Sequence, residues 1–230
     1  MNADIFDFWA DVPGDARVHP SDQPVFARYG SVEAPGHGFD LRCLPLPFGG
    51  PLRTARVVLL FQSPGQSPQD VDEANTPEAH ARYQKQREGR ASLVGPDEHN
   101  AAWRWWAERT KRFGDWRELR DKIAYLNIGA YHSPTFRDLP VLAALPSSRA
   151  ALGWAQTVLF PQAEHGERVV VCLRSAQFWG LGKRRRCGKD LYAPEVGRGG
   201  HIVGKGERAK ARDEVILAVK NGLSRRPLPN

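Results

Sequence analysis

Residues 56–70 have the sequence RVVLLFQSPGQSPQD, in which a short apolar run leads through a Pro-Gly turn to the start of a helix. The apolar residues do not alternate with polar ones, as is typical of a strand buried on both faces of a sheet. Ser67, Pro68 and Asp70 then supply an N-cap, a proline in the first helical turn and an acid at the third helical position. A buried strand that continues directly into a helix indicates a parallel α/β sheet.

Similar strand and helix signals alternate along the rest of the chain. We expect further strands at residues 122–127, 168–173 and 192–196, and helices at residues 76–87, 97–113, 148–159, 175–181 and 207–220. Pro161 and Gly222 are expected to end the helices before them. Right-handed crossovers between parallel strands predict a mainly parallel sheet between two layers of helices, with ligands beyond the carboxyl ends of the strands. The segments after Phe61, Asn127 and Leu173 are therefore expected to meet at one site.

The helix expected at residues 97–113 carries several tryptophans. Trp103, Trp106 and Phe113 are spaced by three and seven residues, so they fall on one side of the helix, and Trp105 points elsewhere. Because this spacing is helical, we expect the three aligned rings to be core rather than a stacking platform for a ligand.

The chain is expected to form one domain. Its 230 residues, 41% hydrophobic and 26% charged, have the composition of an ordinary globular protein. Residues 53–223 form the expected α/β domain, residues 1–52 an irregular N-terminal wrap with a short helix at residues 5–10, and residues 224–230 a frayed tail. The chain has neither a long apolar run nor a basic leader, so we expect a cytoplasmic protein that does not cross a membrane.

Metal and cofactor signatures are missing from the sequence. Cys43, Cys172 and Cys187 are odd in number and widely spaced, which argues against a disulfide framework and a Cys-x-x-Cys metal site. The chain has no His-Glu-x-x-His, Walker, Gly-x-Gly-x-x-Gly or Gly-x-Ser-x-Gly motif. We therefore expect no metal, no metal cluster and no cofactor, and nucleotide triphosphate hydrolysis is disfavoured.

The net charge of +7 favours a polyanionic partner such as DNA. A solvated surface on a basic metabolic enzyme is an equal alternative if charge alone is considered. The residues expected to contact phosphates if DNA is bound are Arg174, Lys183, Arg184, Arg185, Arg186, Arg198 and Lys205.

The Pro-Gly turn after the first buried strand is the first candidate binding segment. Gly65 allows close backbone approach, Pro64 stiffens the loop, and the next helix directs free N–H groups toward the same place. An anionic or carbonyl-bearing ligand would suit this arrangement. The alternative is an ordinary strand-to-helix connection.

Polar residues in two later segments are also candidates. Asn127 offers an amide that can read a base edge, the ring of Tyr131 can stack on a base, and His132, with Ser133 beside it, can stabilise an anion. His201 follows two glycines in a loop that could close over a ligand. The alternative is that the Asn and His side chains only hold turn backbone and that the glycine loop is a plain connector.

With these segments placed, the chain resembles the uracil-DNA glycosylase superfamily over about residues 45–222. The residues Phe61-Gln62-Ser63-Pro64-Gly65 are similar to the superfamily's first motif, where members have Gly-Gln-Asp-Pro-Tyr, Gly-Glu-Ala-Pro-Gly or Gly-x-Asn-Pro-Gly, the last in an uncharacterised bacterial branch. The resemblance implies a four-stranded parallel sheet between helices and a DNA-binding protein that flips a damaged or modified base and hydrolyses its N-glycosidic bond.

The resemblance also implies roles for the candidate residues. Gln62 and Ser63 would position water, and His201 or His132 would steady the leaving base. Base contacts would come from Phe61, Pro64, Gly65, Asn127, Tyr131 and Ser133. Because a serine replaces the usual Asp or Asn and cannot act as a strong base, a non-catalytic protein that binds nucleic acid or a partner stays open, as does an enzyme acting on a nucleoside or an anionic metabolite.

Overall fold

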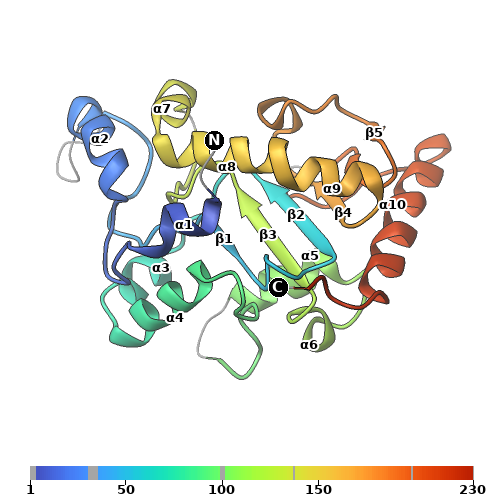
Figure 1. Cartoon of the computed structure of the whole chain (residues 1–230), viewed down its shortest axis with the longest axis horizontal. Helices are drawn as coiled ribbons and strands as arrows, with labels where there is room; N and C mark the ends of the chain where they lie inside the picture. Colours follow the sequence, from blue (N-terminus) through green and yellow to red (C-terminus); the bar gives the residue numbers. More distant parts are fainter. Residues whose placement is uncertain (1–3, 31–35, 99–101, 137, 198, 230) are drawn as a thin grey trace. The chain divides into compact units, whose positions relative to one another are not determined.

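The structure of the chain is a computed structural model that describes residues 4–30, 36–98, 102–136, 138–197 and 199–229 (Figure 1). The chain forms two compact units. The first unit combines Met1–Phe48, Gln62–Gly89 and Asn127–Ala155, and the second combines Gly49–Phe61, Arg90–Leu126 and Gln156–Asn230. Each unit is therefore assembled from three separate segments of the chain.

Almost all of a six-stranded sheet, with the order β1-β3-β2-β4-β6-β5, lies in the second unit. The strands are β1 (Phe48–Gly49), β2 (Val57–Phe61), β3 (Ile123–Asn127), β4 (Val169–Cys172), β5 (Arg185–Cys187) and β6 (Leu191–Ala193). β2 is parallel to β4 and β4 to β6, and the arrows of β2 and β3 point the same way in Figure 1. All residues of β2, β3 and β4 are buried, which confirms the strands expected from continuous apolar runs.

The sheet is mixed and has six strands, so the expected four-stranded parallel sheet is wrong. β5 is an antiparallel edge strand in which Arg185 lies opposite Ala193 of β6. The chain reverses between β5 and β6 at Gly188, whose φ is +58°. A Cβ on this residue would lie 2.5 Å from Cα of Glu164, so the tight reversal depends on glycine. β5 has exposed arginines instead of an apolar run, and for this reason its sequence resembles a solvated loop.

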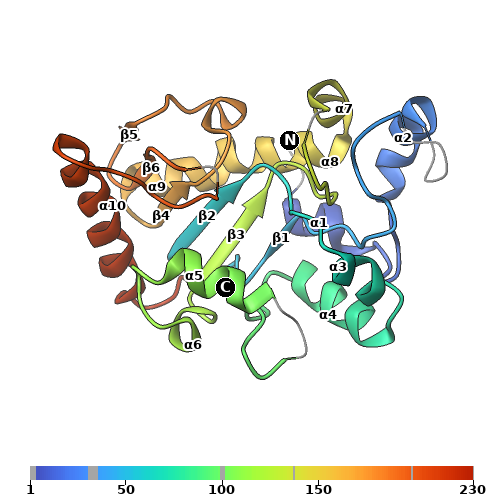
Figure 2. The ribbon, with the colours of Figure 1, turned by 180° about the vertical axis from the view of Figure 1, so that it is seen from behind.

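The second unit also contains the helices that pack beside these strands (Figure 2). They are α5 (Ala102–Thr110), α6 (Trp116–Leu119), the π-helix η2 (Ala155–Leu159), α9 (Phe160–His165), the 3-10 helix η3 (Ala176–Trp179) and α10 (Glu207–Leu223). On α5, the ring of Trp106 stacks on Tyr125 of β3 with a centroid distance of 4.9 Å. Trp106 and Phe113 are buried as expected, Trp103 is only half-buried, and Trp105 is 41% exposed.

Two expected helix ends are wrong. Pro161 does not end a helix but lies in the first turn of α9, where its missing N–H would have no helical partner in any case. Gly222 lies within α10, which continues to Leu223. A Cβ at Gly222 would lie 2.8 Å from Cγ2 of Val169 and 3.1 Å from Cγ2 of Val57. This glycine therefore serves the close approach of α10 to β2 and β4.

The tail after α10 makes hydrogen bonds that involve backbone carbonyls within the second unit. Leu228 N donates to Thr54 O at 2.9 Å, and Arg56 Nε donates to Arg226 O at 2.6 Å. Arg225 Nη1 donates to Gly166 O at 2.8 Å.

The first unit is mainly helical. Its elements are α1 (Ile5–Ala10), the 3-10 helix η1 (Pro20–Asp22), α2 (Gln23–Tyr29), α3 (Pro68–Glu73), α4 (Pro77–Arg87), α7 (Leu139–Ala144) and α8 (Pro146–Trp154). The Ser67–Asp70 capping box at the start of α3 is present as the sequence predicts. Buried Asp22 connects three segments of this unit, because its carboxylate accepts from Tyr131 Oη at 2.5 Å and from Ser147 N at 3.0 Å.

Candidate functional site

In the first unit, the Pro-Gly turn lies beside the segment that follows β3. Gly129 N donates to Gln62 O at 2.8 Å, and Ser133 N donates to Pro64 O at 3.3 Å. Gln62 and Ser63 are half-buried, and Gly65 is exposed. The structure thus brings together two of the three segments that were expected to meet.

His132 joins this turn to the start of α3. The His132 ring is buried, and its Nδ1 lies 2.7 Å from Gly65 O, so this nitrogen carries a proton and donates to the carbonyl. Nδ1 also lies 3.9 Å from Asp70 Oδ2. Burial lowers the pKa of His132, and the Asp70 carboxylate and the Gly65 carbonyl oppose that shift. We therefore assign His132 to the neutral form at pH 7.

Asp70 supplies a carboxylate beside the turn in the first unit. Its Oδ2 accepts from Ser67 N at 2.6 Å and from Ser67 Oγ at 2.8 Å. The Asp70 side chain is 27% exposed. A fixed carboxylate with partial solvent access can accept a proton from water, which Ser63 cannot do.

The other polar candidates of the first unit hold backbone. Asn127 Nδ2 donates to Leu46 O at 2.8 Å, and Ser133 Oγ donates to Gly38 O at 3.0 Å. These contacts match the alternative in which such side chains serve the turn.

The Tyr131 ring is 1% exposed and lies 4.8 Å from the Phe26 ring, while its hydroxyl donates to Asp22. A buried ring offers no face to a base, so we correct the stacking role expected for Tyr131 and place this residue in the core.

In the second unit, the end of β2 meets an aromatic cluster on α5. The Phe61 ring lies 5.7 Å from the rings of both Trp105 and Trp106, and these two indoles are 4.8 Å apart. The guanidinium carbon of Arg109 lies 3.6 Å from the centroid of the Trp105 ring. Arg109 is one helical turn after Trp105, which places both side chains on the same side of α5.

The glycine loop before α10 reaches the same cluster. Val196 and Ile202 form an antiparallel bridge, and Gly200 has a φ of +78°. A Cβ on Gly200 would lie 3.7 Å from Phe61 Cε1 and 3.9 Å from Leu173 O. The second unit therefore brings together the ends of β2 and β4 and this loop, while Arg198 lies outside the described residues.

Positive charge gathers around the aromatic cluster. Arg109 Nε donates to Gly199 O at 2.8 Å. Burial lowers the pKa of Arg109, and the like charge of Arg174 lowers it further. The pKa of Glu108 is lowered mainly by its hydrogen bond with Lys111, and also by His201 and Arg109. The cluster therefore combines flat aromatic surface with cations that favour an anion.

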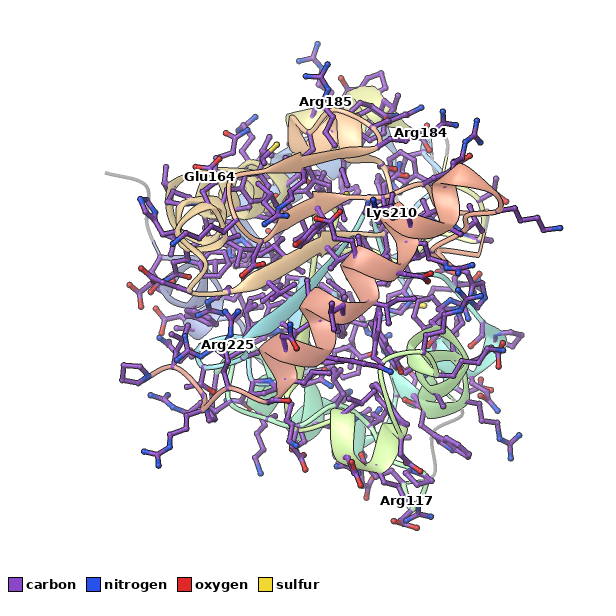
Figure 3. The ribbon with its side chains drawn as sticks, turned by 90° about the vertical axis from the view of Figure 1, so that its right-hand side faces the viewer. Arg117, Glu164, Arg184, Arg185, Lys210 and Arg225 are labelled. Carbon is purple, nitrogen blue, oxygen red and sulfur yellow. The ribbon has the colours of Figure 1, made fainter. Side chains whose placement is uncertain are left out.

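The basic residues near the C-terminus dominate the charge of the chain. Residues 183–230 contain thirteen Lys and Arg against five Asp and Glu, a net charge of +8, which exceeds the +7 of the whole chain. Figure 3 shows Arg184 and Arg185 near β5, Lys210 on α10 and Arg225 beyond it on one side of the second unit. The chain is therefore basic because of this region.

Several of these cations are paired with acids. Arg184 and Arg208 both contact Glu195, and Arg186 contacts Glu214. Seven exposed cations of this region make no ion pair with any residue that the structure describes, and these are Lys183, Arg185, Lys189, Lys205, Lys210, Lys220 and Arg226. Surface ion pairs contribute little to stability, so the paired arginines can also exchange their partners for phosphates.

The predicted residues fall in both units. Gln62, Ser63, Pro64, Gly65, Asn127, His132 and Ser133 belong to the first unit, and Phe61, Arg174, His201 and the basic residues belong to the second. That they share one site remains a prediction.

Comparison with protein-family models, curated proteins and solved structures found no match. The resemblance to uracil-DNA glycosylases therefore rests on the turn motif and on the order of the segments. In the described part of the chain, no group of three or more His, Cys, Asp or Glu side chains could hold a metal ion. None of the described helices has the length and apolar character needed to cross a bilayer.

Trp105 and Arg109, which lie in the aromatic cluster beside Phe61, were not among the candidate residues predicted from the sequence. The available signal was that Trp105 falls outside the apolar side of its helix. An arginine four residues later could have indicated a stacked pair.

Proposed function

We propose that this chain is a DNA-binding protein whose C-terminal basic region contacts the phosphate backbone. The observation that carries the proposal is the net charge of +8 on residues 183–230, against a net charge of −1 on the rest of the chain. Cations concentrated in one region attract DNA and release its counterions on binding. A three-layer fold similar to that of uracil-DNA glycosylases is part of the same proposal.

The salt dependence of DNA binding tests this proposal. If four of the exposed cations without acidic partners each neutralise one phosphate, the affinity for a 20-base-pair duplex falls roughly 100-fold between 50 and 200 mM salt. A Lys183→Ala/Arg185→Ala variant should lower the slope of log K against log salt by about two. Fluorescence anisotropy with a labelled duplex measures both quantities.

The matched control removes two exposed charges that lie outside residues 183–230, in a Lys85→Ala/Arg90→Ala variant. Lys85 belongs to the first unit and Arg90 to the second, and both are exposed. This variant should keep the slope of the wild type. Equal slopes for both double variants would refute the proposed phosphate surface, and no measurable DNA binding would refute the function.

Base excision is the second candidate function, and the position of Asp70 favours it. The Asp70 carboxylate would take a proton from a water that attacks C1′ of the flipped nucleotide. The N-glycosidic bond would break, and its electron pair would leave with the base. Asp70 would thus replace the acid that the motif lacks at Ser63.

Duplexes carrying uracil or other altered bases test the second candidate. Alkali should cleave the strand wherever a base has been removed, and Asp70→Asn should slow that removal at least 100-fold. An asparagine at position 70 can still accept a hydrogen bond from Ser67 at the start of the helix. The control is Asp72→Asn, because Asp72 is an exposed residue of the same helix. Intact strands with every altered base would reject excision while leaving DNA binding open.

A further inference from the structure

Trp105 is an exposed aromatic residue of α5, although the buried side of this helix is formed by other residues. Its indole is 41% exposed, whereas Trp106 beside it is 8% exposed and stacks on Tyr125. Thr110 and Phe113 complete the buried side of this segment. The core of the second unit therefore does not need Trp105, and a large aromatic surface is left for another partner.

The Trp105 side chain is held in place from several directions. Its ring contacts the Phe61 ring at 5.7 Å with an interplanar angle of 57°, and the Trp106 ring at 4.8 Å with an angle of 80°. Arg109 covers the ring at 3.6 Å, and Arg109 Nη1 donates to Trp105 O at 3.3 Å. A ring fixed in this way loses little conformational entropy when a ligand stacks on it.

Arg109 adds a positive charge to the flat surface. Its hydrogen bonds go to two neutral carbonyls, those of Gly199 and Trp105, and it makes no ion pair within the described residues. Arg174 is exposed at the end of β4 and adds its charge to that of Arg109. A planar aromatic surface beside two guanidinium groups matches a nucleotide, which joins a flat base to a phosphate.

The glycine loop approaches this pair closely. A Cβ at Gly199 would lie 3.0 Å from His201 Cδ2 and 3.7 Å from Arg109 Nη2. The backbone of Gly199 accepts the Arg109 hydrogen bond, so the loop fixes the guanidinium without a side chain of its own at that position.

We propose that Trp105 and Arg109 form a stacking site for an unpaired nucleotide of a DNA strand. The base lies on the exposed surface of the Trp105–Arg109 pair, and Arg109 and Arg174 contact its phosphates. The inference rests on the proposed DNA binding and adds to it a preference for unpaired over paired nucleotides. An unpaired base exposes both of its faces, whereas a base inside a duplex is already stacked.

The test compares two labelled DNA molecules at one salt concentration. One is a 20-base-pair duplex, and the other is the same duplex with three unpaired thymines in one strand. We expect the wild type to bind the second DNA more tightly, and Trp105→Ala to weaken binding of that DNA about 5–100-fold with little effect on the paired duplex. Trp105→Phe should keep part of the preference because a smaller ring can still stack.

A tryptophan on the same helix supplies the control. Trp103→Ala removes an indole that is half-buried and that contacts Arg104 instead of Arg109, and it should keep the preference. Circular dichroism verifies that each variant is folded. Free thymidine monophosphate serves as competitor. If it displaces the DNA that carries the unpaired thymines at equal molar amounts, the site binds a free nucleotide instead of a nucleotide within a strand.

Different results would contradict the stacking site and the phosphate surface. Salt-dependent binding of both DNA molecules with no preference, or a preference that Trp105→Ala leaves intact, would overturn the stacking site and leave the phosphate surface standing. Absence of binding to either DNA, together with absence of Trp105-dependent quenching of fluorescence by thymidine monophosphate, would overturn both.

Discussion

Replacing Asp22 with alanine is expected to lower the free energy of unfolding by about 3–5 kcal/mol. Asp22 is fully buried, and its two carboxylate oxygens accept from Tyr131 Oη and Ser147 N. Ser147 lies at the start of α8, so the carboxylate also meets the positive end of that helix. Alanine would leave a buried hydroxyl and a buried N–H without their acceptor.

Urea unfolding measures the Asp22 effect, and two further variants locate its cause. Asp72→Ala makes the same chemical change at an exposed position and should alter stability by less than about 0.5 kcal/mol. In a Tyr131→Phe background, Asp22→Ala should lower the free energy of unfolding by less than it does in the wild type. The Tyr131 hydroxyl, one of the two donors that would lose their acceptor, is already absent from that background. Similar losses for Asp22→Ala and Asp72→Ala would contradict this account.

Replacing Gly50 with alanine is the second change with a large expected effect, a loss of about 3 kcal/mol in the free energy of unfolding. Gly50 has a φ of +79°, where a side chain is strained. A Cβ there would also lie 2.3 Å from Ile123 O and 2.9 Å from Cα of Ala124. Both neighbours are backbone at the start of β3, so the clash cannot be relieved by rotating a side chain.

Gly180 provides the matched control for Gly50. Its φ is +75°, and a Cβ there would meet only the end of the flexible Gln156 side chain, at 3.4 Å. Gly180→Ala should therefore lower the free energy of unfolding by about 1 kcal/mol, which corresponds to the backbone strain alone. Urea unfolding of both variants measures the difference, and equal losses would show that contact with β3 does not limit position 50.

The central strands could be predicted from the sequence to within one residue. β2 and β4 are continuous apolar runs, β3 is apolar until its last residue, Asn127, and runs of this kind are typical of strands buried on both faces of a sheet. β1 has two residues and β5 has exposed arginines, so neither leaves a hydrophobic pattern to detect. The edges of the sheet were therefore missed although its centre was found.

The candidate site was predictable only where it follows from strand topology. The contact of the Gln62 turn with Gly129 and Ser133 follows from two neighbouring strands that end at the same edge. The burial of Tyr131 depends on Asp22 and Phe26, which lie more than 100 residues earlier in the chain. No local pattern connects residues so far apart, and for this reason an aromatic residue of the core resembled a stacking residue.

The interleaving of the two units constrains how the chain can fold during its synthesis. The last segment of the first unit ends at Ala155, so about two thirds of the chain must leave the ribosome before that unit can close. β2 can pair with β4 only later in synthesis, because Val57 pairs with Val169. Until then, a nascent polypeptide carries the fully apolar Val57–Phe61 segment without its β4 neighbour, a period in which chaperone binding would protect it from aggregation.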